Sequence, residues 1–387
     1  MAIIPARSRN MIKVAQGCLG EEELEELKSV WNYGYYGLSY KAAEFEDKLK
    51  EYLGAKNVVS VNTGTSALHL ALDALGIGKG DKVIVPSLTF VASFQAISAT
   101  GATPVPCDVY PDTLLMNMKD VMSKITPKVK AIMPVHYCGN PCDMEMLMLF
   151  KKRCGVRIIE DAAHALGSTY NGQKVGSFGD ITCFSFDSIK NITCGEGGAI
   201  VCSDDDFTNL CKEKRLLGIK RDVVKTSAWQ DQWKRRTWAF EVNTQGFRYH
   251  MSQINAAIGV AQLRKIDSFI ARRREICRMY DNTFKTLDGI QPLSVNYDEV
   301  APHLYVIRVK KGPRNSLKEF LQGKDIETAI NYIPNHLHPF YAGNYKLPET
   351  DKAYDEILSL PLHCALSDED VRKVIGAVIE GTQQCQP

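Results

Sequence analysis

Seven short apolar runs alternate with amphipathic helical patterns over the first 240 residues, and few folds accommodate such an alternation. Several runs are rich in Val and Ile and apolar throughout, as are strands that a sheet buries on both faces. The runs are NVVSV (57–61), KVIV (82–85), TPVPC (103–107), KAIMPV (130–135), VRIIE (156–160), ITCFSF (181–186) and GAIVC (198–202). Strand–helix alternation implies right-handed crossovers. We therefore predict an α/β fold with three α/β/α layers around a mainly parallel, seven-stranded sheet.

The pattern changes after the sixth run. The last two runs are separated only by a loop that contains KNITCGEGG, where we expect special chemistry. Residues 204–240 are polar and carry three tryptophans, which indicates a helix followed by a mobile or interface segment. A long helical pattern (251–287), a strand (302–310) and two further helices (317–325 and 368–381) follow. We predict a large domain over residues 1–250, including the N-terminal segment, and a small α+β domain over residues 251–387.

Composition narrows the possible partners. The 387 residues carry a formal net charge of +2, so a nucleic-acid or membrane partner is not expected. The apolar runs are too short to span a bilayer and the N-terminus lacks an apolar signal region, so we expect a cytoplasmic protein. The twelve cysteines are scattered through predicted strands and helices, which indicates free, mostly buried thiols. Cys138 and Cys142 have no second pair at zinc-site spacing, so we expect no metal site.

Two strand ends carry residues suited to bind an anion and a cation. Gly64-Thr65-Ser66 opens a helix after the first strand, where N–H groups and hydroxyls can hold a phosphate; a simple helix cap is the alternative. Asp161 ends the run VRIIED, and ligands of open α/β sheets bind at the carboxyl ends of strands. A carboxylate there could pair with a protonated ring nitrogen, with about 5 kcal/mol of raw attraction at roughly 3 Å and an effective dielectric of about 20. Capping of the next turn is the alternative.

Lys190 lies after the sixth apolar run, in FSFDSIKNITCGEGGA. Partial burial would lower its pKa and make its amine a nucleophile that can form a Schiff base. Ser185, in the preceding strand, could donate a hydrogen bond to a phosphate, and the glycines that follow permit tight turns beside a ligand. A single lysine is far more often a solvated surface residue. The argument for chemistry therefore rests on the combination of the anion site, Asp161 and Lys190.

The order and spacing of these three features resemble the aspartate-aminotransferase-like enzymes of fold type I, which use pyridoxal 5′-phosphate (PLP). Longer stretches are similar to the DegT/DnrJ/EryC1/StrS family of sugar aminotransferases. They are NTGTSALHLALDALGIGKGDKVIVPSLTF, VHYCGNPCDM, IIEDAAHALGSTYNGQKVGSFGD and FSFDSIKNITCGEGG. The resemblance extends from about Ile12 to the C-terminal helix. It implies PLP as the cofactor, with pyridoxamine 5′-phosphate as the aminated form.

The resemblance also implies a role for each matching residue. Lys190 would form the Schiff base and then carry the proton between the cofactor and the sugar carbon, and Asp161 would pair with the pyridine nitrogen. His164, in the AAHA stretch, would lie near the ring hydroxyl, and Phe90, in SLTF, would stack on the ring face. Ordinary interior packing is the alternative for both. The residues implied for the phosphate are Gly64, Thr65, Ser66 and Ser185.

One segment departs from the family pattern. Where the family has G-[YF]-N-Y-R-M, this chain reads GFRYHMS, with Arg248 in place of Asn and His250 in place of Arg. In the family the Asn reaches the cofactor phosphate of the partner subunit, which implies a homodimer with shared sites. Arg248 is then a candidate cross-subunit ligand of the cofactor phosphate or of the substrate diphosphate. Substrate contacts are implied for His250, for Tyr35 in NYGYYGLSY (32–40) and for His336 in NYIPNHLHPFY (331–341).

Together these features predict a PLP-dependent aminotransferase that moves an amino group from an amino acid, commonly L-glutamate in the family, to a nucleotide-linked keto-6-deoxysugar. The loop KNITCGEGG resembles that of members acting at C4 of the hexose. The alternatives are a C3 aminotransferase, a PLP-dependent sugar dehydratase and a non-catalytic nucleotide-sugar binder. Lys190 argues against the dehydratases, which have histidine there, and the intact cofactor set argues against the binder. The nucleotide (dTDP, UDP or GDP) stays open.

Overall fold

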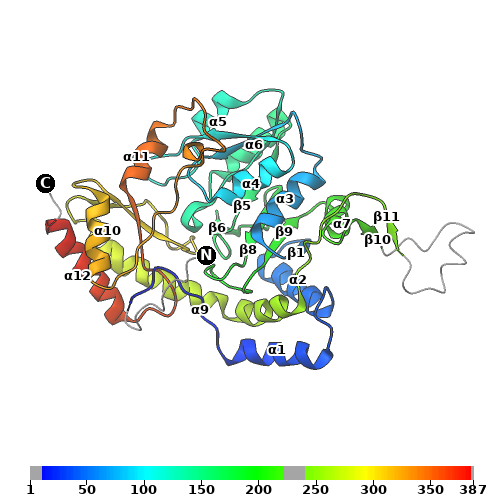
Figure 1. Cartoon of the computed structure of the whole chain (residues 1–387), viewed down its shortest axis with the longest axis horizontal. Helices are drawn as coiled ribbons and strands as arrows, with labels where there is room; N and C mark the ends of the chain where they lie inside the picture. Colours follow the sequence, from blue (N-terminus) through cyan, green and yellow to red (C-terminus); the bar gives the residue numbers. More distant parts are fainter. Residues whose placement is uncertain (1–10, 221–239, 385–387) are drawn as a thin grey trace, which may run out of the picture.

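A seven-stranded sheet forms the centre of the molecule (Figure 1). The computed structural model describes residues 11–220 and 240–384. In chain order the strands of the sheet are β1 (Val58–Val61), β2 (Lys82–Pro86), β3 (Thr103–Cys107), β4 (Val129–Ile132), β5 (Arg157–Asp161), β8 (Ile181–Ser185) and β9 (Gly198–Cys202). Across the sheet they run in the order β1-β9-β8-β5-β4-β2-β3, and of these seven strands β9 alone runs opposite to the others. The predicted mainly parallel sheet is thereby confirmed.

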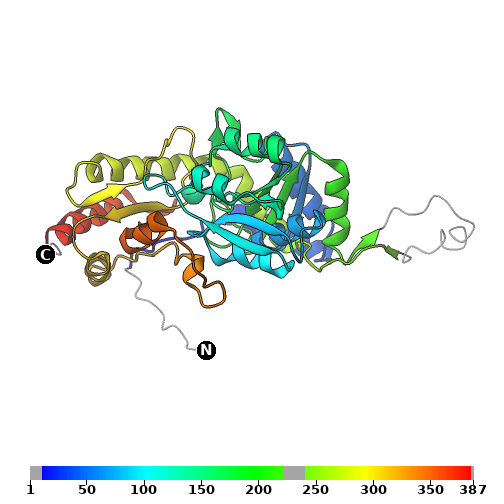
Figure 2. The same ribbon diagram turned by 90° about the horizontal axis from the view of Figure 1, so that it is seen from above.

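Helices cover both faces of this sheet and give the three expected layers (Figure 2). One face packs against α3 (Gly64–Ala74), α4 (Val91–Ala99) and α7 (Asp205–Lys214). The other packs against α2 (Tyr40–Leu53), α5 (Met118–Lys124), α6 (Met144–Cys154) and α9 (Gln253–Phe284). Successive residues of a strand point to opposite faces, so Val83 and Val85 join one core and Ile84 joins the other. Burial on both sides explains why these strands are apolar throughout.

The last third of the chain builds a second sheet. Its antiparallel strands are β12 (Ile290–Pro292), β13 (Tyr305–Val309) and β14 (Ile357–Leu360). The helices here are α10 (Arg314–Gly323), α11 (Pro348–Glu356) and α12 (Asp368–Gln384). The long helix α9 contributes Val260 to the core of the large sheet and Tyr280 to the core of the small one. It therefore joins the two sheets, and the boundary between residues 250 and 251 stays a prediction.

Several short elements complete the chain. They are α1 (Glu21–Tyr33), the hairpin β6 (Thr169–Tyr170) with β7 (Gln173–Lys174), the pair β10 (Ile219–Lys220) with β11 (Glu241–Val242), and the 3-10 turns η1 (Tyr137–Gly139) and η2 (Asn335–Leu337). The helix expected from residue 204 is α7, whereas the tryptophans of the expected mobile or interface segment lie outside the described residues. Among the helices of residues 11–220 and 240–384, none combines the length and apolar composition needed to cross a membrane.

The cysteines depart from the sequence expectation at one point. Cys18 and Cys364 form a disulfide, so the thiols of the chain are not all free. The two residues are 346 positions apart and meet only because the N-terminal segment lies along the chain that follows β14. No local spacing could have indicated this contact. The other nine cysteines of the described part are free, and all but Cys154 are buried, as expected.

Candidate active site

A cavity of about 570 Å³ opens at the carboxyl ends of the parallel strands. Open α/β sheets bind their ligands at this edge because the strand-to-helix turns converge there. The cavity brings together seven of the residues selected from the sequence, which are Gly64, Thr65, Phe90, Asp161, His164, Ser185 and Lys190. They come from the turns after β1 and β2, the end of β5 with the turn that follows it, the end of β8 and the loop between β8 and β9.

One end of the cavity is built for an anion. It is lined by Gly64 and Thr65 in the first turn of α3 and by Ser185 at the end of β8. A side-chain carbon on Gly64 would lie 2.7 Å from the Cβ of Ser185, so only glycine lets the helix start approach the strand this closely. Helix-start N–H groups beside two hydroxyls are donors suited to a phosphate.

Ser66 does not line the cavity. Its backbone N–H donates to Thr63 Oγ1 at 3.0 Å, and its hydroxyl accepts from the same atom at 2.9 Å. The helix cap considered as the alternative for this segment therefore exists, and Thr63 provides it. Thr65, one position before Ser66, stays in the cavity wall.

Asp161 is the last residue of β5 and is 6% exposed. Its Oδ2 accepts a hydrogen bond from Ser93 Oγ at 2.7 Å, and its Oδ1 accepts from the N–H of Ala163 at 3.2 Å. These two donors fix the orientation of the carboxylate in the cavity wall. A fixed carboxylate at this position can pair with a cationic group of a bound ligand.

Lys190 lies on the loop between β8 and β9 and is partly buried. Burial lowers the pKa of its ammonium group to about 8, and the carboxylates of Asp161 and Asp187 oppose that shift. Its backbone N–H donates to Asp187 O at 3.1 Å, which closes the turn that carries it. The pKa makes the neutral amine accessible near physiological pH, as a nucleophile or a proton carrier requires.

His164 forms a hydrogen bond that the sequence did not indicate. Its Nε2 lies 3.0 Å from the hydroxyl of Tyr332, and its ring centroid lies 4.3 Å from that of His303. Burial, with a further effect of Lys190, holds the pKa of His164 well below its usual range, so the imidazole is neutral. Tyr332 and its neighbour Asn331 line the cavity but were not selected, although their segment was chosen for another residue.

Phe90 is not a core residue. Its side chain is 56% exposed, and its ring centroid lies 5.5 Å from that of Tyr332. Because both rings line the cavity, they present flat apolar surface to whatever binds there. Interior packing, the alternative weighed for Phe90, is therefore wrong.

Four other selected residues do not line this cavity. His336 is buried, with Nδ1 2.8 Å from Ser87 Oγ and Nε2 3.0 Å from Asp351 Oδ1. Tyr35 is 53% exposed, in the segment that joins α1 to α2. The remaining two, Arg248 and His250, precede α9 and form isolated bridges with Leu216 and Val61, respectively. Within one chain, none of these four residues lies in the cavity beside Lys190.

The family comparison matches this geometry. Residues 17–379 match the family model described as the DegT/DnrJ/EryC1/StrS aminotransferase family. The spore coat polysaccharide biosynthesis protein SpsC of Bacillus subtilis is 36% identical over 371 residues, which cover 93% of this chain and 94% of SpsC. The aminotransferase TlmJ of Streptoalloteichus hindustanus is 35% identical, with a TM-score of 0.90 over 97% of this chain and 100% of TlmJ. The sugar aminotransferase Spr1654 of Streptococcus pneumoniae, in its pyridoxamine phosphate form, is 31% identical, with a TM-score of 0.91 over the same shares.

The cavity suits PLP. The start of α3 and the hydroxyls of Thr65 and Ser185 can hold the phosphate, Asp161 can face the ring nitrogen, and Lys190 can hold the aldehyde carbon. Nδ1 of His164 is buried without a hydrogen-bond partner among the described residues, as expected beside a site for a polar ligand. On these grounds the chain belongs to the DegT/DnrJ/EryC1/StrS aminotransferase family and is a PLP-dependent sugar aminotransferase.

Proposed function

We propose that this enzyme transfers an amino group from L-glutamate to a nucleotide-linked keto-6-deoxysugar, at C4 of the hexose. The observation that carries the proposal is the meeting of an anion site, a fixed carboxylate and a low-pKa amine in one cavity. The loop KNITCGEGG supports C4 by its likeness to loops of C4-acting members. PseC of Helicobacter pylori, 26% identical with a TM-score of 0.87, is described as an aminotransferase of pseudaminic acid biosynthesis.

In the proposed reaction, each of these residues of the chain has a separate role. When bound, PLP supplies the electron sink that lets a C–H bond beside nitrogen ionise. Lys190 holds the cofactor, and its Nζ then carries the proton to and from the carbon that bears the amino group. Asp161 keeps the ring nitrogen protonated by pairing with it, since the carboxylate is already held by its two donors. Thr65 and Ser185 anchor the phosphate, which sets the distance of the ring from Lys190.

His164 and Tyr332 act together in this proposal. The neutral imidazole and the phenol share one hydrogen bond, so each fixes the other's orientation in the cavity wall. The ring of His303 contacts that of His164 at an angle of 39°, and burial likewise keeps the pKa of His303 well below its usual range. An uncharged pair beside Lys190 leaves Asp161 and Asp187 as the charges that set its protonation.

We further propose that the enzyme is a homodimer in which Arg248 binds the cofactor phosphate or the substrate diphosphate of the partner's site. Arg248 is exposed and does not line its own cavity, as a residue that serves another subunit must be. Apolar residues stay exposed near the cavity, among them Ile189 at 38% and Ile333 at 45%. A second subunit would cover such a surface. The cytoplasmic location stays a prediction.

Mixed dimers test the shared site. Lys190→Ala and Arg248→Ala, each inactive alone, should regain activity when the two proteins are unfolded together and refolded, because each mixed dimer then holds one intact site. Refolding each variant alone is the control. Activity that never returns in the mixture, or an active monomer in sedimentation, contradicts the proposal.

Product analysis tests the reaction. The enzyme is incubated with PLP, L-glutamate and a panel of dTDP-, UDP- and GDP-linked sugars, each as the 4-keto-6-deoxy and the 3-keto form. NMR should place the new amino group at C4, with 2-oxoglutarate released in equal amount. An amino group at C3 overturns the regiochemistry alone. Loss of the sugar's C3 oxygen without amination, or binding without turnover, overturns the aminotransferase proposal for these substrates.

A further inference from the structure

The N-terminal segment of residues 12–20, which we call the strap, is bound to the C-terminal part of the chain. Ile12 exchanges backbone hydrogen bonds of 2.9 Å with Asp325 and Glu327 beside α10, and Val14 O accepts from Leu362 N at 3.0 Å. The strap is therefore fixed to the chain that flanks the small sheet, and the disulfide of Cys18 makes a covalent link further along it.

The other end of the strap lies on the loop of residues 186–197, which we call the lysine loop because it carries Lys190. A side-chain carbon on Gly17 would come 2.7 Å from Ser188 O and 3.5 Å from Thr193 Cγ2. Ser188 and Thr193 lie on either side of Lys190 in the sequence, so the strap touches the loop on both flanks of the amine. Glycine at position 17 is what permits this close approach.

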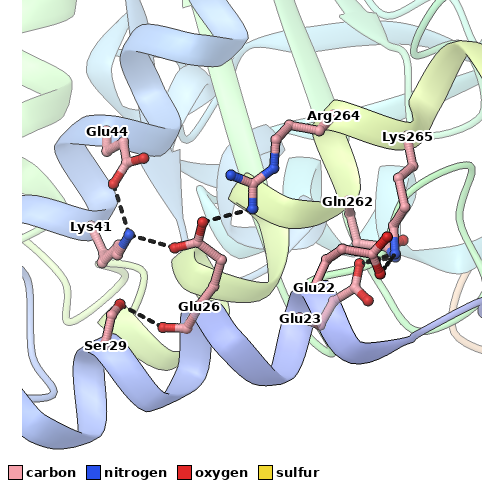
Figure 3. Close-up of polar contacts among 9 residues, drawn as sticks. All are labelled: Glu22, Glu23, Glu26, Ser29, Lys41, Glu44, Gln262, Arg264 and Lys265. Carbon is pink, nitrogen blue, oxygen red and sulfur yellow. Dashed lines mark hydrogen bonds and ion pairs between the residues drawn. The ribbon is translucent and has the colours of Figure 1, made fainter.

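One buried side chain joins the strap, the lysine loop and α1. Gln262 of α9 is 1% exposed. Its Oε1 accepts from Thr193 N at 3.2 Å, while its Nε2 donates to Cys18 O at 2.7 Å and to Glu23 Oε1 at 2.8 Å. Figure 3 shows Gln262 beside Glu23. Both amide hydrogens and the carbonyl are used, so the orientation of the amide is fixed.

The partner of this amide on α1 is itself firmly held. Glu23 accepts from Gly20 N at 2.6 Å and pairs with Lys265 Nζ at 2.6 Å. Burial acts to raise the pKa of Glu23, but the donors Lys265, Gln262 and Gly20 hold it below its usual range, so the carboxylate is charged. Figure 3 also shows a second, separate link between these helices, in which Glu26 of α1 lies between Lys41 and Arg264.

Two further amides hold the lysine loop, but neither reaches the strap or α1. Asn191 donates to Leu166 O at 3.3 Å and to Ala301 O at 3.2 Å, and Asn255 donates to Cys194 O at 2.7 Å. Among these three amides, Gln262 alone connects the loop to the strap and to α1. The backbone N–H at position 193, three residues after Lys190, is thus where Gln262 links the loop by hydrogen bonds to the strap and to α1.

We propose that Gln262 is a positioning residue for Lys190, which it aims by fixing Thr193 against the strap and α1. This inference rests on the proposed role of Lys190. A displacement of about 1 Å between reacting groups can cost roughly 100-fold in rate, so a residue remote from the cavity can control turnover through the loop alone. Gln262 is uncharged and does not line the cavity, so its effect is on geometry rather than on net charge in the cavity.

The test uses the holoenzyme, with steady-state kinetics and the pH midpoint of the cofactor absorption band as readouts. Gln262→Leu keeps the volume and removes the amide. We expect kcat to fall roughly 10- to 100-fold, KM for the sugar substrate to change little, and the pH midpoint of the band to move. Arg264→Gln is the matched control, because it breaks the Glu26 link between α1 and α9 but touches neither strap nor loop; it should behave as the wild type.

A second set of variants tests the proposal if Gln262→Leu does not fold. Gln262→Glu puts two carboxylates together and should lower kcat. Adding Glu23→Gln restores a donor–acceptor pair between positions 262 and 23 and should recover part of the activity, because Cys18 O still lacks its donor. A wild-type kcat in folded Gln262→Leu, an equal loss in Arg264→Gln, or no recovery in the double variant overturns the proposal. Lys190→Ala separates the positioning role of Gln262 from the proposed role of Lys190, because an unchanged absorption band in that variant refutes the role of Lys190 itself.

Discussion

The protonation of Lys190 can be tested directly in cofactor-free protein. Burial lowers the pKa of Lys190 from 10.5 to about 8, although Asp161 and Asp187 both act to raise it. That difference increases the deprotonated fraction at neutral pH about 300-fold. Because the two carboxylates oppose the shift, Asp161→Asn should lower the pKa further and move the reactivity of the amine to lower pH.

Reductive alkylation with a small neutral aldehyde measures this reactivity. Peptide mass spectrometry at each pH gives the labelling rate of Lys190, with Lys28 as an internal reference. Lys28 is exposed, and its hydrogen bond to Glu25 raises its pKa above 10.5. Lys190 should label with a midpoint near pH 8 and Lys28 only in strongly alkaline solution. A Lys190 midpoint at that of Lys28, or an upward move in Asp161→Asn, would refute the reasoning.

The same pKa fixes the sign of a stability effect. Between about pH 8 and 10.5 the unfolded chain binds a proton at Lys190 that the folded cofactor-free protein does not. The contribution of Lys190 to stability is therefore complete above the unfolded pKa and is lost as pH falls through about 8. Lys190→Met should flatten the pH dependence of the unfolding free energy in this window, as denaturant titrations at several pH values would show.

Three further outcomes are expected. Gly64→Ala places a carbon 2.7 Å from Ser185 Cβ. Over-packing of about 1–3 kcal/mol should weaken PLP binding roughly tenfold or more in fluorescence titrations, and an unchanged affinity would contradict the anion site formed by Gly64, Thr65 and Ser185. Tyr332→Phe removes the hydrogen bond to His164, worth about 0.5–1.5 kcal/mol, and should lower kcat with little change in melting temperature. Alkylation of unreduced protein should leave Cys364 unmodified in peptide maps, and a labelled Cys364 would disprove the disulfide.

The sequence was informative wherever local pattern and burial coincide. Apolar runs such as VRIIE predicted strands because the sheet buries both of their faces. The position of Asp161 in the cavity followed from the rule that strand ends converge, and the same rule located Ser185. β9 pairs antiparallel with β8, and the loop that joins the two strands contains no crossover helix.

What the sequence did not predict depends on contacts between distant segments. Tyr332 reaches His164 from 168 positions away, and no spacing rule relates the two. His336 resembles a substrate-contacting residue of the family, yet its ring is held by Ser87 and Asp351. The sequence supplied the chemical character of such residues, but packing between the two sheets decides which of them meet.

The strap has a consequence for when the enzyme becomes competent during synthesis. Cys18 of the strap and its disulfide partner Cys364 are 346 residues apart. At typical translation rates, Cys364 is therefore synthesised roughly 20–70 s after Cys18. The strand that precedes the lysine loop, the loop and α9 are all made within that interval. Until the last few dozen residues arrive, the strap that touches the lysine loop lacks its disulfide and its hydrogen bond to Leu362. Fragments that end before Leu362 should therefore fold their central sheet and place Gln262 against Thr193, yet leave the strap without these C-terminal links.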